Sequence, residues 1–392
     1  LFETDQKGQE RQHLISLCES YHLDPPKPDA DHFIADFGEF QLRWQQHGEF
    51  CTYTVYQQAP LSDLFSKPAL CCVPEKWLKE MSGKVMAAIH ACIVAQDDEP
   101  DLEETARHFA GHALMGSKIA NGAASAFTDF QIYEDGFSRF LIIDRHLHPG
   151  QAGRYLHRLF DIEVYRIMSL LAFPMARKLI PKLNRADQDL LRITTTMHQS
   201  HCDDAELMDE VTALALEVEN CFSKTHFRFG AANAYYKLVE SRIESLREIR
   251  IEGVQTLGEF LQRRLEPAIR TCQIAQNRLS MLSERIGNAG QLLRTRVDIT
   301  LERQNQALLT SMNRRAQLQL HMQTTVEGLS VAAISYYTVS LIGYAAKAGK
   351  SFGLPIKPDL VVGISIPAVI VVIALGVRHI RKMVDQVKQE DG

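Results

Sequence analysis

Residues 328–346 read GLSVAAISYYTVSLIGYAA and contain no charged side chain. A run of this length suits a helix that crosses the ~30 Å hydrocarbon core of a bilayer, which takes about 20 residues. The same run carries four serine or threonine hydroxyls and three tyrosines. A helix that only anchors a protein in lipid does not need these groups. The stretch therefore predicts a first transmembrane helix with one polar face.

A second uncharged run, LVVGISIPAVIVVIALGV, covers residues 360–377. The connecting residues 347–359 contain two prolines and two glycines, as expected of a short exposed loop. The two runs predict a transmembrane hairpin whose flanks lie on one side of the lipid bilayer; the alternative is a buried core hairpin of a soluble protein. The basic sequence RHIRK opens the tail, residues 378–392. The pattern favours a bacterial inner-membrane protein with two spans and both termini in the cytoplasm.

Polar side chains in the first run recur on one side of a helix. Seven-residue spacing relates three of them to Gln323, and one more falls between, so the candidate stripe is Gln323, Ser330, Tyr337, Ser340 and Tyr344. Polar groups within a membrane face a partner helix or a water-filled path, because facing lipid is costly. Two interpretations stay open, a packing seam and a wet pathway. Both predict a homo-oligomer formed through the stalk and the first membrane helix.

The region before the first span predicts one long helix, because it contains no proline between Pro267 and Pro355. Leu279, Leu282, Ile286, Ala289 and Leu293 follow an apolar heptad spacing typical of a coiled coil. Residues 268–327 are thus a stalk that leads into the span at 328–346. At ~1.5 Å per residue, a continuous helix over 268–346 would be on the order of 120 Å long.

The part of the chain before the stalk predicts two further regions. Residues 1–148 read as an α+β cytoplasmic domain with a mostly antiparallel sheet. Hairpins are expected at 37–58, around His47-Gly48, and at 125–145, around a two-residue Asp135-Gly136 turn. A strand is expected within 84–95 and a helix over 101–115. Residues 149–267 predict a helical bundle with segments at 149–182, 187–197, 203–223 and 225–265, in which Pro174 and Pro181 kink or end the first segment.

Composition and the absence of known motifs argue against several classes of function for this protein. The net charge of −5 argues against nucleic acid as a partner. The eight cysteines show no disulfide framework, which favours a reducing compartment. No phosphate-binding loop, dinucleotide fingerprint or metalloprotease motif is present, so we expect no enzyme activity, no catalytic residue and no cofactor.

Two histidine-containing stretches raise the question of a metal site. His108 and His112 have the i, i+4 spacing of zinc ligands but lack a third ligand, and they are interpreted as ordinary helix residues. The string HQSHCDD collects His198, His201, Cys202 and Asp203. Asp203 also suits a helix N-cap, and we favour the cap over a metal site.

The stretch RWQQHGEFCTY resembles a family of uncharacterised bacterial proteins that are predicted to be membrane-anchored, and the resemblance extends along the entire chain. The residues that carry it are Arg43, Trp44, His47, Glu49 and Tyr53, followed by FRFGAANAYY at 227–236 and LQLHMQTTVEGLSVAAISYY at 318–337. The resemblance implies membrane anchoring and no particular activity.

The order of predicted parts is also similar to that of CorA-type divalent-cation transporters, which are pentamers whose first membrane helix lines the pore. The Gly-Met-Asn signature of those transporters is replaced by GYAAKAGK at 343–350. The resemblance implies an oligomeric membrane protein, either an ion conduit or a degenerate relative of one. The alternative is a membrane-tethered scaffold or adaptor whose α+β domain binds a cytoplasmic protein partner.

Overall fold

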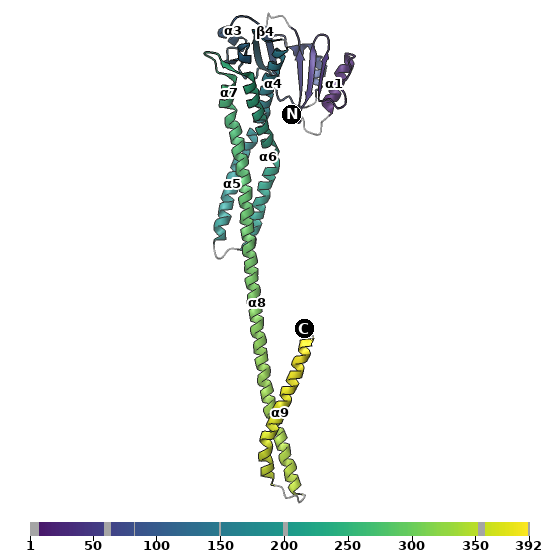
Figure 1. Cartoon of the computed structure of the whole chain (residues 1–392), viewed down its shortest axis with the longest axis vertical. Coiled ribbons are helices and arrows are strands. Elements are labelled where there is room, and N and C mark those ends of the chain that lie inside the picture. The colour runs from purple at the N-terminus through teal and green to yellow at the C-terminus, as the bar shows by residue number, and fades with distance from the viewer. Residues whose placement is uncertain are drawn as a thin grey trace. The chain divides into compact units, whose positions relative to one another are not determined.

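The computed structural model describes residues 8–58, 64–81, 83–148, 150–198, 203–351 and 357–390. The chain forms two compact units, residues Leu1–Leu293 and Arg294–Gly392. One element, helix α8 (Glu266–Ser351), belongs to both units (Figure 1). The predicted fold class is confirmed: an α+β region with mostly antiparallel strand pairing precedes long helices and an apolar C-terminal helix.

The first sheet of unit 1 is an antiparallel meander of β1 (His32–Asp36), β2 (Gln41–Gln46) and β3 (Cys51–Tyr56). Its β2–β3 hairpin is the one predicted at 37–58, with Gln46 opposite Cys51 and the His47 N–H donating to the Phe50 carbonyl. Helix α1 (Gln9–Ser20) buries Leu14 and Leu17 against this sheet. Trp77 of the short helix α2 (Glu75–Lys79) joins the same small core, and a 3-10 turn, η2 (Ala69–Cys72), precedes α2.

The second sheet has the strand order β4-β7-β6-β5-β8. The strands are β4 (Ile89–Ala95), β5 (Met115–Ile119), β6 (Ala124–Thr128), β7 (Ser138–Asp144) and the two-residue β8 (Ile249–Arg250). The β4–β7 pair is parallel and the other pairs are antiparallel. The 3-10 turn η3 (Ala120–Gly122) connects β5 to β6.

Two predictions for the hairpin and the helix that flank strands of this sheet were wrong in detail. The β6–β7 hairpin exists, but its connection runs from 129 to 137, because Phe130 takes a left-handed φ of 51° and turns the chain out of the strand. Asp135 and Gly136 lie within this loop, where the Gly136 N–H donates to the Tyr133 carbonyl. The helix expected over 101–115 is only α3 (Leu102–Arg107), because Ala110 and Gly111 have left-handed φ values and lead into β5.

Helices α4 (Gln151–Leu170), α5 (Phe173–Met197), α6 (Asp204–Leu246) and α7 (Leu257–Arg264) complete unit 1 together with the first part of α8 (Figure 1). Sheet residues such as Ile142 pack against Leu159 of α4, Val239 of α6 and Leu261 of α7 in one core. A second core lies among α5, α6 and α8. Its buried members include Leu183, Leu190, Leu214, Val218, Leu279, Leu282 and Ile286.

The helix boundaries differ from those predicted. Pro174 lies in the first turn of α5, where its missing N–H costs nothing, and Pro181 is accommodated inside α5 without ending it. The segments expected at 203–223 and 225–265 are instead the single helix α6, followed by β8 and α7. Arg247 ends α6 with a left-handed φ of 53°, so the next residues can pair with β5.

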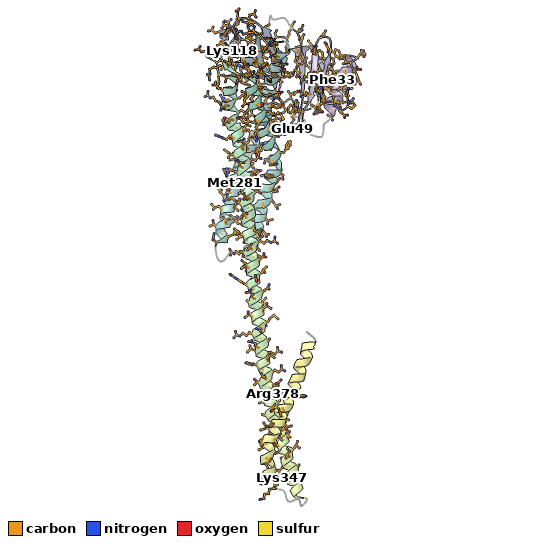
Figure 2. All side chains as sticks on the ribbon, in the orientation of Figure 1. Phe33, Glu49, Lys118, Met281, Lys347 and Arg378 are labelled. Carbon is orange, nitrogen blue, oxygen red and sulfur yellow. The ribbon has the colours of Figure 1, made fainter. Side chains whose placement is uncertain are left out.

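In unit 2, α8 continues to Ser351 and α9 (Pro358–Glu390) follows. The helix expected over 268–346 is therefore continuous and somewhat longer, and Gly287 and Gly290 do not interrupt it. Helical structure also extends into both ends of the predicted loop at 347–359. Figure 2 shows Lys347 near the loop end of this hairpin and Arg378 on α9 farther from the loop.

The packing of α8 in unit 1 predicts that alanine substitutions at two leucines of this helix have very different effects on stability. Leu282 is 2% exposed and Leu292 is 66% exposed. We expect Leu282→Ala to lower the free energy of unfolding of unit 1 by about 2–5 kcal/mol, because it leaves a cavity in the core. Leu292→Ala should change it by less than about 0.5 kcal/mol. Denaturant unfolding measures both, and equal effects would contradict the packing.

Candidate functional site

Two helices of the described chain are long and apolar enough to cross a membrane, judged by length and composition. They are the C-terminal part of α8, up to Ala348, and Pro358–His379 of α9. Within unit 2, α9 approaches one face of α8 closely: a Cβ added at Gly343 would lie 3.1 Å from Cγ2 of Val362. Ser335 and Ala346 on the same side of α8 are buried. This face is therefore the one that α9 covers.

The predicted polar stripe lies on a different face of α8. Tyr337 is 68% exposed and Tyr344 is 71% exposed. Gln323 and Ser330 are also exposed, and Ser340 is half-buried. The Ser330 hydroxyl donates to the Val326 carbonyl at 2.9 Å, whereas neither tyrosine hydroxyl bonds to another described residue. The intramolecular hairpin leaves the two phenols uncovered.

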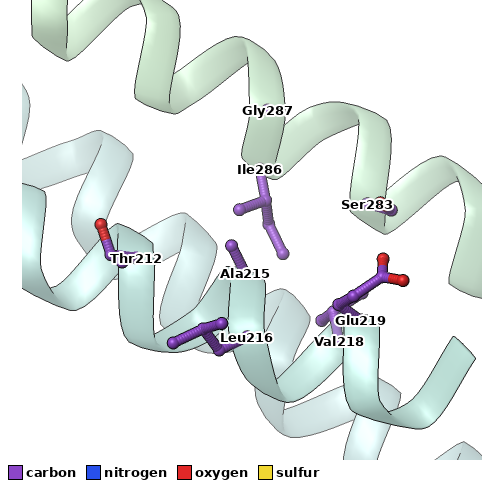
Figure 3. A pocket seen from close by; sticks show the side chains of 8 residues that line it. All are labelled: Thr212, Ala215, Leu216, Val218, Glu219, Ser283, Ile286 and Gly287. Atoms are coloured by element: carbon purple, nitrogen blue, oxygen red, sulfur yellow. The ribbon is translucent and has the colours of Figure 1, made fainter. Parts of the chain in front are cut away.

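A shallow groove of about 390 Å³ lies between α6 and α8 in unit 1 (Figure 3). It exists because α8 presents Ser283 and Gly287 where larger side chains would fill the space beside Ala215. Its lining is apolar apart from Thr212, Glu219 and Ser283. A single carboxylate on an open apolar groove does not form a catalytic arrangement.

Three residues of the RWQQHGEFCTY motif, Arg43, His47 and Glu49, lie where the first sheet meets α4 and α6. Nη1 of Arg43 lies 2.8 Å from Nε2 of His157 on α4, and the Tyr56 hydroxyl lies 2.7 Å from the same nitrogen. Because Arg43 can only donate, Nε2 of His157 acts as an acceptor and the imidazole is neutral. This cluster holds one end of the sheet against α4.

A second contact joins the same hairpin to α6. Glu49 accepts a hydrogen bond from Nη1 of Arg228 at 2.7 Å, and both side chains are less than a fifth exposed. The His47 ring stacks on Phe50, whose ring contacts Tyr235 of α6. Removing one partner of such a half-buried ion pair leaves an uncompensated charge. The motif therefore ties the sheet to both helices.

The remaining motif residues serve the small core of the first sheet. Trp44 is 1% exposed among Leu14, Leu42 and their neighbours. The Tyr53 hydroxyl donates to the Glu10 carbonyl at 3.3 Å, and its ring meets Trp77 edge-on. The motif thus divides into core packing and the junction with the helices.

Asp129 has partners that the sequence did not indicate. Its side chain is fully buried and accepts hydrogen bonds from Nδ1 of His112 at 2.8 Å and from the Tyr133 hydroxyl at 2.7 Å. The interpretation of His108 and His112 as helix residues was wrong, because α3 ends at Arg107, with His108 as its C-cap. The pairing arises because β5 and β6 are antiparallel with Met115 opposite Thr128, so their loops share one end of the sheet.

The preference for an N-cap at Asp203 is confirmed: its carboxylate accepts a hydrogen bond from the Ala205 N–H at 2.9 Å. His201 and Cys202 lie outside the described residues. Among the residues that the structure does describe, no three His, Cys, Asp or Glu side chains are grouped to hold a metal ion.

These features define a protein with an α+β and helical body and two helices long enough to cross a membrane. A family model described as "Protein of unknown function (DUF3422)" matches residues 1–384, and the chain belongs to that family. No curated protein and no solved structure matches the chain. The whole-chain resemblance to an uncharacterised family is thereby confirmed, whereas the resemblance to CorA-type transporters is not shown.

The junction predicts a pH dependence. Burial and the neighbouring Arg43 guanidinium lower the pKa of His157 from its ordinary value of about 6.5. Below about pH 6.5 this histidine binds a proton in the unfolded chain, whereas in the folded junction it does so only at a lower pH. The free energy of unfolding is therefore not reduced by His157 above about pH 6.5, and it decreases as the pH falls below that value.

Thermal unfolding of unit 1 should show a loss of stability as the pH is lowered from 8 to 5. His157→Gln keeps a hydrogen-bond acceptor without a titrating group, so this variant should lose less stability over the same range. His32→Gln, at an exposed position, is the matched control and should retain the full dependence. Identical pH profiles for His157→Gln and the unaltered chain would contradict the assignment. His47, whose pKa is also lowered mainly by burial, should account for part of what remains.

Proposed function

We propose that this is an oligomeric, non-enzymatic protein of the bacterial inner membrane, with two spans and both termini in the cytoplasm. Copies of α8 surround a common axis and turn Ser330, Tyr337, Ser340 and Tyr344 toward one another. Ions cross along this hydroxyl-bearing face. The proposal takes its plan from the CorA-type transporters, whose signature is absent here, since the chain has GYAAKAGK at 343–350.

The observation that carries the proposal is the position of Tyr337. It lies at the middle of the uncharged run 328–346, is 68% exposed, and is on a face that α9 does not cover. A phenol hydroxyl facing the centre of a bilayer would lose its hydrogen bonds to water without replacing them, which is costly. Another copy, or water between copies, would supply those hydrogen bonds.

The stripe suits a conduit better than a tight packing seam. Seams between membrane helices are rich in small residues that let the backbones approach. Gly343 and Ala346 supply such a surface, and they lie on the side of α8 that faces α9. The stripe instead presents two exposed tyrosines one above the other, with Gln323 at its start. Large polar side chains keep helices apart and leave room for water.

Ion flux into proteoliposomes tests the proposal. The triple variant Ser330→Ala, Tyr337→Phe, Tyr344→Phe removes three hydroxyls with little change in volume, and we expect it to alter cation flux several-fold. Tyr336→Phe is the matched control, because Tyr336 is equally exposed at 70% but lies about 100° around the helix. Flux no greater than that of empty vesicles, or flux unchanged in the triple variant, would contradict the conduit.

A second candidate is a membrane-tethered scaffold whose body binds a cytoplasmic protein. The observation in its favour is that unit 1 has its own extensive cores. This function predicts that the body keeps its biological role when residues 328–379 are replaced by an unrelated transmembrane hairpin. Complementation of a deletion strain by that chimera would favour the scaffold, and failure of a well-expressed chimera would favour the conduit.

A further inference from the structure

A line of uncharged residues runs along one side of α8 from the segment before the span into the span itself. Successive members are seven or four positions apart: Leu301, Leu308, Met312, Gln319, Val326, Ser330, Tyr337 and Tyr344. Steps of seven, four and seven add to 18 residues, which is five turns of an α-helix at 3.6 residues per turn. These side chains therefore share one face of a straight helix. We call them the α8 line.

The first part of the α8 line is exposed and, apart from Gln319, apolar. Leu301, Leu308, Met312 and Val326 are between 53% and 66% exposed. Between residues 301 and 327 the charged side chains are Glu302, Arg303, Arg314, Arg315 and Glu327, and none of them falls on the line. A single exposed leucine needs no explanation, but four exposed apolar side chains on one face of a helix do.

The other described helix of unit 2 does not cover this line. α9 packs on the face of α8 that holds Ser335, Gly343 and Ala346. At 100° per residue, that face lies on the side of α8 opposite Tyr337 and Tyr344. The partner that covers the α8 line is therefore not the hairpin itself.

We infer that the α8 line is the surface on which a second copy of this chain docks, in parallel and in register, through the stalk as well as the span. The line changes from apolar to hydroxyl-bearing near residue 328, and a parallel copy changes at the same level. Apolar side chains then pack on apolar ones in the stalk, and the hydroxyls of the copies face one another in the span. The inference rests on the proposed function for the common orientation of the copies in the membrane.

The spacing also sets the form of this contact. A strict seven-residue repeat produces a left-handed coiled coil, whereas an 18-residue repeat keeps the line straight on an unsupercoiled helix. Over residues 301–344 the spacing therefore favours a nearly straight bundle of helices rather than a left-handed coiled coil. Gln319 is the one polar residue of the line in the stalk, and amide groups meeting at one level fix the register of the copies.

Disulfide cross-linking in native membranes tests the inference. All eight cysteines of the chain lie at or before Cys272, and a cysteine-free variant reports only an introduced thiol. Leu308→Cys and Met312→Cys should give disulfide-linked dimers under mild oxidation. Leu309→Cys and Leu318→Cys are matched controls, since these leucines are 65% and 57% exposed but lie off the line. We expect at least a five-fold difference in the dimer fraction.

Equal cross-linking on and off the α8 line would overturn the inference, as would dimers at Tyr337→Cys alone with none at 308 or 312. A second measurement avoids reliance on oxidation: Leu308→Glu should lower the oligomeric mass of the purified full chain, and Leu309→Glu should not. Cross-links at 308 and 312 in a chain that conducts no ions would support this inference and contradict the conduit. Ion flux without these cross-links would do the reverse.

Discussion

The continuity of α8 is the constraint on which the other features depend. One helix supplies the buried residues Leu279, Leu282 and Ile286 to the core of unit 1 and the uncharged run 328–346 to unit 2. A helix satisfies its own backbone hydrogen bonds, so it can pass from water into lipid without unpaired groups. What changes along α8 is only the chemistry of its faces. In unit 1, α5 and α6 cover one face of α8. In unit 2, α9 packs on a second face, and the α8 line stays exposed.

The features that could be predicted from sequence were those with long, regular patterns. Two uncharged runs with a short loop, the absence of proline between 267 and 355, and the alternation around His47-Gly48 all led to the observed elements. Boundaries set by single backbone conformations could not be predicted in this way. Ala110, Phe130 and Arg247 have left-handed φ values that their side chains do not favour. Each of them ended or redirected an element where the sequence pattern continued.

The long-range side-chain contacts in unit 1 could not be predicted from the sequence either, for a different reason. Glu49 and Arg228 are 179 positions apart, and Arg43 and His157 are 114 positions apart. Only the meeting of the first sheet with α4 and α6 brings them together. Asp129 and His112 similarly depend on the antiparallel pairing of β5 and β6. The stripe on α8 could be proposed from spacing alone because its members share one helix.

The proposed account requires that more than one copy of the chain share the uncovered face of α8. The most direct measurement is the protein molar mass of the full chain purified in mild detergent, with the detergent contribution subtracted. The account predicts a protein mass that is a whole-number multiple of 44.3 kDa and at least twice that value. A protein mass of one chain, retained at high protein concentration and in lipid nanodiscs, would contradict it.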